Sequence, residues 1–300
     1  MSKQEGSRRR TLWVTAGALV VIGIGVVVAM SNDRRPALIS ENCIASANGV
    51  SHALAPDQAS NAALISAVAV RREMPARAAT IAIATAIQES KLRNIDYGDR
   101  DSVGLFQQRP SQGWGTVEEI LDPVYSANAF YDALARIDDY ESMEITEAAQ
   151  EVQRSGFPEA YADHEPEGRA FASALTGHSP AALTCRLRPS AATDTQEPTD
   201  GGLTPRAADV LNTAQTGFGD LEAEPAAEDG ATVRFELDGG ESSRRGWALA
   251  QWAVASADLL DVVAVETDGQ RWERGPDGKW DANEAAPGPG RVNVTVANGQ

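Results

Sequence analysis

The chain has 300 residues and a formal net charge of −17 at pH 7, with 43 acidic and 26 basic residues. This length suits about two domains, and so acidic a chain is not expected to bind nucleic acid through charge. The three histidines are scattered and neither a phosphate-binding nor a dinucleotide motif is present, so we expect no metal site and no other cofactor.

An uncharged apolar stretch comes first in the chain. Lys3 and three arginines at 8–10 precede residues 11–31, a run about long enough to cross a bilayer as a helix. The excess of basic residues before the run places residues 1–10 in the cytoplasm and the rest of the chain outside, so we expect a single-pass cell-membrane protein. A cleaved signal peptide is the alternative, with residues 27–29 as a mediocre cleavage site.

Residues 43–185 are predicted to form a helical domain. Helical spacing of apolar residues, caps and first-turn prolines indicate helices that open near the following residues: Pro56, Pro75, Pro123, Thr146 and Pro166. The helix that ends near Ser90 carries alanine and isoleucine on every face, so it should be central in the core. Cys43 and Cys185 bracket the domain, and we expect them to pair in an oxidising compartment, two separate thiols being the alternative.

The remainder is predicted to be a linker and a small domain. Residues 186–230 are rich in Pro, Thr, Asp, Glu, Gly and Ala and have few large apolar side chains, so we expect a disordered linker. Residues 231–300 alternate like strands at 232–237 and 292–296, with a helical pattern between them, which predicts a small α/β domain of unknown role. With the transmembrane helix and the helical domain, the fold class is predicted to be mainly α.

Glu89 is the strongest candidate for a catalytic residue. It closes the apolar helix, and Gly104 opens a turn with the letters GLFQQ fifteen residues later. Burial and the partial negative charge of a helix C-terminus both favour the protonated form of a carboxyl group. Such an acid can give a proton to a leaving oxygen, as glycoside cleavage requires. A solvated charge in a last helical turn is the plainer alternative.

Glu89 and Ser90, followed by Gly104, Leu105, Phe106 and Gln107, resemble the lysozyme-like superfamily, especially soluble lytic transglycosylases and goose-type lysozymes. In those families a helix ending in Glu-Ser is followed by a loop and a Gly-Leu-Met/Phe-Gln turn that lines the sugar cleft. Residues 97–101 (YGDRD) also look like the Gly-Asp-Arg loop of goose-type enzymes. The resemblance covers roughly residues 56–175 and points to an actinobacterial membrane-anchored branch.

The resemblance implies cleavage of the β-1,4 bond between N-acetylmuramic acid (MurNAc) and N-acetylglucosamine (GlcNAc) in peptidoglycan. Glu89 would act as general acid and then as base, letting the muramyl 6-hydroxyl attack its own anomeric carbon to give a 1,6-anhydro product. Ser90 and the turn residues 104–107 would contact the substrate. Phe106, with Trp114 and Tyr125, could stack on sugar faces, although all three rings could equally be core.

Asp99 and Asp101 are the candidates for a second carboxylate, which a hydrolase would need. Acidic residues in a glycine-containing loop more often form turns. The goose-type pattern has an aspartate soon after the turn, whereas Gln108 and Arg109 follow here, which favours transglycosylation over hydrolysis.

Tyr161 resembles the tyrosine of a third transglycosylase motif, whose hydroxyl contacts the catalytic glutamate. Residues 162–164 read ADH where that motif has Asn-Ala-Gly, so ordinary packing is the competing interpretation. These departures from the family pattern also keep open a second function, that of a non-catalytic peptidoglycan-binding or cell-wall-assembly protein. Peptidoglycan strands are the expected partner, with cell-wall or division proteins as possible others.

Residues 245–252 (RGWALAQW) and 268–272 (DGQRW) resemble a small domain recurrent in secreted actinobacterial proteins. Some relatives of that domain carry a His-x-His strand near their end. Asn293 and Thr295 stand where those histidines would be, which argues against metal-dependent activity there.

Overall fold

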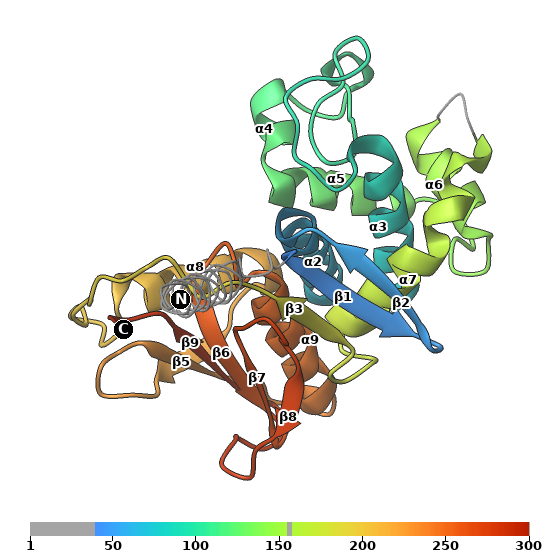
Figure 1. Ribbon diagram of the computed structural model, residues 1–300. Coiled ribbons are helices and arrows are strands. Elements are labelled where there is room, and N and C mark those ends of the chain that lie inside the picture. The colour runs from blue at the N-terminus through green and yellow to red at the C-terminus, as the bar shows by residue number, and fades with distance from the viewer. Residues whose placement is uncertain (1–39, 155–157, 300) are drawn as a thin grey trace, which may run out of the picture. The chain divides into compact units, whose positions relative to one another are not determined.

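Two antiparallel sheets organise the part of the chain that the computed structural model describes, residues 40–154 and 158–299 (Figure 1). The smaller has the order β2-β1-β3, formed by β1 (Asn42–Ala47), β2 (Val50–Leu54) and β3 (Leu183–Arg186). The larger has the order β4-β5-β9-β6-β7-β8, formed by β4 (Glu222–Pro225), β5 (Thr232–Glu236), β6 (Val262–Thr267), β7 (Gln270–Glu273), β8 (Trp280–Ala282) and β9 (Arg291–Val296).

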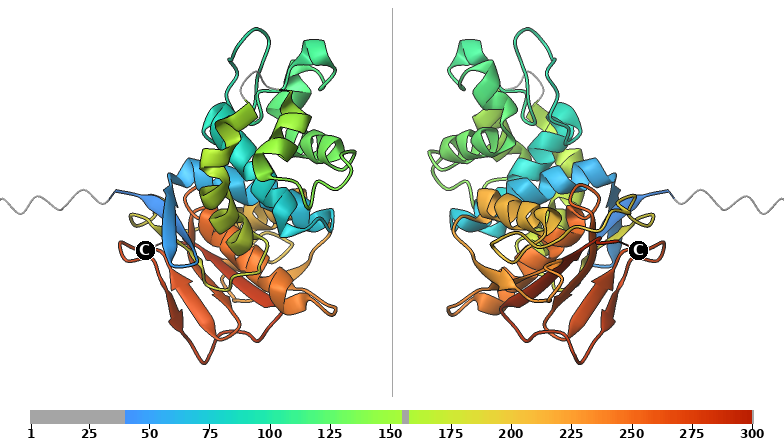
Figure 2. Two further views of the ribbon diagram at one scale, coloured as in Figure 1. Left: turned by 90° about the vertical axis from the view of Figure 1, so that its right-hand side faces the viewer. Right: turned by 90° about the vertical axis from the view of Figure 1, so that its left-hand side faces the viewer.

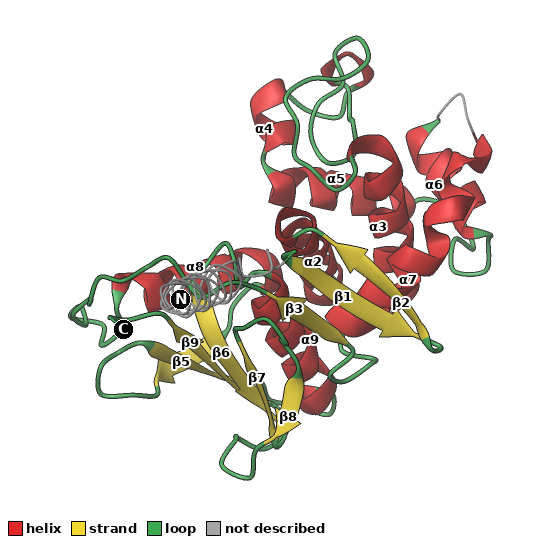
Figure 3. Cartoon of the chain, viewed as in Figure 1, coloured by secondary structure: helices red, strands yellow, loops and turns green. Residues whose placement is uncertain are grey.

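Helices fill most of the sequence between β2 and β3 (Figure 3). They are α2 (Pro56–Arg71), α3 (Ala76–Ser90), η1 (Pro110–Gln112), α4 (Val117–Leu121), α5 (Pro123–Leu134), α6 (Ile145–Gln153), η2 (Pro158–His164) and α7 (Glu165–Leu175), where η denotes a 3₁₀ helix. After β3 come α8 (Pro205–Phe218) and α9 (Ser242–Ala255).

The predicted mainly-α class is wrong, because the residues that the structure describes are 41% helix and 18% strand, which makes the fold α/β. The overlooked β1–β2 hairpin had a recognisable signal. Asn48 and Gly49, both at positive φ, form the two-residue loop between the paired residues Ala47 and Val50. Asn-Gly is a strong hairpin sequence because both central residues of this turn adopt positive φ.

The predicted membrane anchor is also not supported. No helix within residues 40–154 and 158–299 has the length and apolar character needed to cross a membrane. The cytoplasmic tail 1–10 and the transmembrane helix 11–31 were predicted in a segment that lies outside the described residues. The single-pass membrane localisation is therefore withdrawn.

Helix α3 lies at the centre of the helical part, as its sequence predicted. It contacts α2, α5, α6, α7 and η2, and its residues 78–87 are all buried. Two threonines inside this apolar helix, Thr80 and Thr85, hydrogen bond back to the carbonyl oxygens of Ala76 and Ile81. Their hydroxyl groups are thus satisfied without water, which lets α3 be surrounded on all sides.

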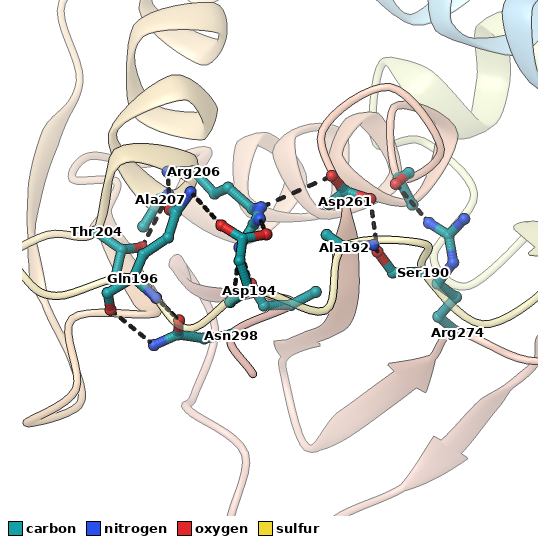
Figure 4. Close-up of polar contacts among 12 residues, drawn as sticks. Ser190, Ala192, Asp194, Gln196, Thr204, Arg206, Ala207, Asp261, Arg274 and Asn298 are labelled. Atoms are coloured by element: carbon teal, nitrogen blue, oxygen red, sulfur yellow. Dashed lines mark hydrogen bonds and ion pairs between the residues drawn. The ribbon is translucent and has the colours of Figure 1, made fainter. Parts of the chain in front are cut away.

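Residues 186–230 contain α8 and β4, so the prediction of a disordered linker is wrong. A network of polar contacts holds the segment against the sheet (Figure 4). Arg206 on α8 pairs with Asp194 and donates to the carbonyl oxygen of Ala297 at 3.1 Å. Gln196 and Asn298 exchange two hydrogen bonds. Composition underestimated this segment because it counts apolar side chains and cannot see satisfied polar pairs.

Helix α9 joins the helical part to the six-stranded sheet, and it contacts α2, α7 and β3 as well as β6 and β9 (Figure 2). Gln251, fully buried on α9, accepts a hydrogen bond from Leu183 N at 2.8 Å and donates to Ala174 O at 2.7 Å. Trp280 Nε1 donates to Leu183 O at 2.9 Å. Residues predicted as a separate C-terminal domain therefore share one core with the helices.

Cys43 on β1 and Cys185 on β3 form a disulfide bond, which confirms the predicted pairing. The bond closes a loop with a sequence separation of 142. Because the bond restricts the unfolded chain, reduction should lower the free energy of unfolding by about 5 kcal/mol in the chain-entropy description. Urea unfolding with and without reductant measures this loss. A variant with both cysteines replaced by alanine should already show the lower stability and no response to reductant.

Candidate active site

Glu89 lies in the last turn of α3 and is half-buried. The helix ends because Lys91 and Leu92 both adopt left-handed backbone conformations, with φ of 53° and 55°. Leu92 N then donates to Ala86 O at 2.9 Å, which satisfies a terminal carbonyl group of the helix, and the Leu92 side chain is fully buried. The end of α3 is therefore anchored in the core, and Glu89 has a fixed backbone position.

Tyr161 contacts Glu89 directly. Its hydroxyl Oη donates to Glu89 Oε1 at 2.7 Å, and its ring is fully buried within η2. The two residues are 72 positions apart in the chain. No other described residue donates a hydrogen bond to the second oxygen, Glu89 Oε2. The carboxyl group is thus oriented through one oxygen, while the other remains available for proton transfer.

Ser90 connects the end of α3 to the turn at 104–107. It is buried, its Oγ donates to Leu105 O at 2.7 Å, and it accepts a hydrogen bond from Arg93 N at 3.2 Å. Its hydroxyl group is engaged within the protein, so Ser90 positions the turn relative to Glu89.

Gly104 begins the turn at a φ of +82°, and its N–H donates to Ile95 O at 2.7 Å. A Cβ atom at this position would lie 2.8 Å from Ile120 O, so both the backbone conformation and the space require glycine. The backbone of the turn can therefore approach α4 closely.

Leu105 and Phe106 point into the core and are fully buried. The Phe106 ring stacks on Phe130 with 4.6 Å between ring centroids, and Phe106 O accepts a hydrogen bond from Gln153 Nε2 at 2.7 Å. Neither side chain is placed to stack on a sugar, although both were predicted to contact substrate. Their contribution is to hold the turn.

Gln107 uses its amide within the loop. Its Nε2 lies 3.2 Å from Tyr97 O and 3.3 Å from Gly104 O, both carbonyl acceptors. Its Oε1 occupies the space beside Gly98, where a Cβ atom would lie only 1.8 Å away. The side chain thus joins two ends of the loop, which is a different role from the predicted contact with substrate.

Asp99 and Asp101 do not form a second catalytic carboxylate with Glu89. Asp101 Oδ1 pairs with Arg109 Nε at 2.8 Å, and its Oδ2 accepts from Ser111 N at 2.8 Å. These hydrogen bonds, that from Arg109 first, hold the pKa of the Asp101 carboxyl well below its usual range. The Asp99 side chain is 92% exposed. Of the three carboxyl groups, only Glu89 contacts Tyr161.

A cleft of about 1020 Å³ lies beside the turn, and Glu89 is not among its lining residues. Its walls include Trp114, Tyr125, Met143 and Gln153, and Gln153 also binds the turn through Phe106 O. Tyr125 Oη donates to Trp114 O at 3.2 Å, which fixes the two aromatic residues relative to each other. Both rings are half-buried, so they contribute to packing and to the cleft wall at once.

Three residues of this site, Gln88, Gln153 and His164, were not predicted from the sequence. Gln153 binds the turn, and His164 contacts Gln88, the neighbour of Glu89, with 2.9 Å between His164 Nε2 and Gln88 Oε1. The spacing of Tyr161 and His164 was a usable signal, because residues three apart in a 3₁₀ helix lie on the same face. Nothing in the local sequence around Gln153 indicated its partner.

A scan against models of known protein families gives no match, and a search of curated proteins finds no similar sequence. Within residues 40–154 and 158–299, no three His, Cys, Asp or Glu side chains are grouped so that they could hold a metal ion. The chemical interpretation therefore depends on the residues of the site themselves.

The close packing at Gly104 can be tested by comparison with Gly113. Both have nearly the same φ, +82° and +83°, but a Cβ atom at Gly113 would meet nothing within 4 Å. Gly113→Ala should cost about 1 kcal/mol through backbone strain alone. Gly104→Ala should cost about 2–4 kcal/mol because overpacking is added. Urea unfolding measures both, and equal losses would contradict the proposed close approach to Ile120.

The hydrogen bonds that Asp101 accepts should make the stability of the protein depend on pH. Because its pKa is lowered on folding, its stabilising contribution is present above the unfolded pKa of about 3.9 and is lost as pH falls further. Asp101→Asn should therefore lower the urea midpoint at neutral pH, and the difference from the wild type should shrink below about pH 4. Asp99→Asn makes the same change of charge in the same loop and should have little effect at either pH.

Proposed function

We propose that the chain cleaves the β-1,4 bond between MurNAc and GlcNAc in peptidoglycan by lytic transglycosylation, with Glu89 as the single general acid and base. The observation that carries this proposal is the hydrogen bond from Tyr161 Oη to Glu89 Oε1. It joins a carboxyl group at the end of a buried helix to a buried tyrosine from a distant segment. The Gly-Leu-Phe-Gln turn is held beside them by Ser90.

One carboxyl group suffices for this reaction. Protonated Glu89 gives its proton through Oε2 to the glycosidic oxygen, and the bond between that oxygen and the muramyl anomeric carbon breaks. The muramyl 6-hydroxyl then forms a bond to the same carbon and returns its proton to Glu89. The product is a 1,6-anhydro sugar and no water is consumed, so the carboxyl group is regenerated in its starting form.

Tyr161 stabilises the intermediate charge state of Glu89. Glu89 becomes negatively charged when it gives up its proton, and a hydrogen bond donated to a carboxylate favours that charged form. The donor is already aligned at 2.7 Å in a buried ring, so little rearrangement is needed during the reaction. A hydrolase would instead require a second carboxylate to activate water. Asp101 is engaged with Arg109, which favours transglycosylation.

Non-catalytic binding of peptidoglycan is the second candidate function. The observation in its favour is that the cleft of about 1020 Å³ is lined by Trp114 and Tyr125 but not by Glu89. Aromatic rings beside amide and charged groups suit a sugar chain. A protein of this kind would retain glycan strands without cutting them.

Glu89→Gln should lower the rate of fragment release from purified peptidoglycan by roughly 10³-fold, because the amide cannot donate or accept the catalytic proton. The substitution keeps the acceptor for Tyr161, so the fold should be unchanged by circular dichroism. Mass spectrometry identifies the products: anhydro-muropeptides are lighter by one water molecule than hydrolytic products. Glu118→Gln, on an exposed helical residue, should leave release unchanged. Release by the wild type with reducing ends would indicate hydrolysis, and no release would favour the binding protein.

Tyr161→Phe should reduce the rate of release by about tenfold to a hundredfold, since the ring remains packed while the donor to Glu89 is removed. The loss should fall on kcat, because the hydroxyl group acts on Glu89 and not on bound sugar. An unchanged kcat would make Tyr161 a packing residue only.

A further inference from the structure

Two hydrogen bonds, side by side, connect the last turn of α3 to η2. Tyr161 Oη donates to Glu89 Oε1 at 2.7 Å, and His164 Nε2 lies 2.9 Å from Gln88 Oε1. Gln88 and Glu89 are consecutive in α3, while Tyr161 and His164 are three apart in a 3₁₀ helix and so share a face. The two pairs therefore form one two-point contact between the elements, which we name the α3–η2 contact.

The second pair has a defined polarity. An amide oxygen only accepts hydrogen bonds, so the proton between Gln88 and His164 belongs to His164 Nε2. Both the neutral ring protonated on Nε2 and the imidazolium cation can make this bond. The contact between His164 and Gln88 is thus compatible with either charge state of the ring.

Charged groups around His164 do not compete for that proton. The nearby Glu167 is a half-buried carboxyl group whose pKa is raised by burial, while His52 and His164 act on it in the opposite direction. Glu167 therefore interacts with His164 through charge, and the hydrogen bond of the His164 ring is to Gln88.

The Tyr161 ring is fully buried, so packing and the bond to Glu89 already hold it in place. The His164–Gln88 bond adds a second fixed point between η2 and α3, because His164 follows Tyr161 by one 3₁₀ turn and bonds to the residue next to Glu89. A displacement of about 1 Å at a reacting group can reduce the rate by roughly a hundredfold. Restraint of η2 therefore bears directly on the geometry of the Glu89 carboxyl group.

We propose that His164 and Gln88 are positioning residues, whose hydrogen bond holds η2 so that Tyr161 Oη stays aligned with Glu89 Oε1. This inference rests on the proposed function for its kinetic consequences. Neither residue touches the reacting atoms in this assignment. The sequence ADH after Tyr161, which departs from the transglycosylase motif, supplies this contact through its histidine.

The kinetic experiment is a double-mutant cycle on the full chain with soluble peptidoglycan fragments. His164→Ala and Gln88→Ala should each lower kcat about tenfold with KM within about twofold. The double variant should be no slower than either single variant, because the same bond is removed once. His164→Gln keeps an N–H donor and should recover most of the rate. His178→Ala, at an exposed histidine, is the matched control and should behave as the wild type.

Several outcomes would overturn the inference. Additive losses in the double variant would mean that the two side chains act separately. An inactive His164→Gln variant would make His164 an acid or base in its own right. A rise in KM with unchanged kcat would place both residues in substrate binding. Full activity of His164→Ala would show that η2 needs no such restraint.

A measurement independent of activity separates this inference from the proposed function. Nitrogen-15 NMR of the imidazole rings in the wild type should show His164 protonated on Nε2, and Gln88→Ala should shift that Nε2 resonance because the hydrogen-bond acceptor is lost. If the wild type releases no product, the proposed function fails, while this result still tests the contact. A ring protonated on Nδ1 would contradict the His164–Gln88 bond directly.

Discussion

The candidate site depends on one hydrogen bond, from Tyr161 Oη to Glu89 Oε1. A buried tyrosine cannot leave its hydroxyl group without a partner, and a carboxyl group at the end of a buried helix gains from a donor. The bond can form only if α3 ends at a fixed point and η2 lies against it. The burial of α3 on all sides and the capping of its end by Leu92 provide the first condition.

Around this bond the loop between α3 and α4 is held by donors to its carbonyl oxygens. Ser90 binds Leu105 O, Gln153 binds Phe106 O, and Gln107 reaches the carbonyl oxygen of Tyr97. Ser90 and Gln107, which the sequence predicted as substrate contacts, thus hold the turn instead. This arrangement fixes the backbone beside Glu89, which the proposed general acid catalysis by this one residue requires.

The C-terminal part contributes to the same folded unit. Gln251 on α9 satisfies the backbone of both β3 and the end of α7, and the disulfide bond joins β1 to β3 at the same sheet. A network centred on Arg206 orders a segment whose composition is poor in apolar residues. The helices that carry Glu89 and Tyr161 are therefore supported from the far end of the chain.

Local patterns in the sequence determined the position and burial of α3 and the pairing of the cysteines, because these depend on spacing within a few residues or on the only cysteines present. The association of Glu89 with a Gly-Leu-Phe-Gln turn was predicted from a family resemblance. The strands of the small sheet, the order of residues 186–230 and the partners of Ser90, Gln107 and Asp101 were decided by tertiary structure. The reason is that a polar side chain carries no record in the sequence of which distant carbonyl or carboxylate it will meet, and only the folded core brings Tyr161 and His164 to the end of α3.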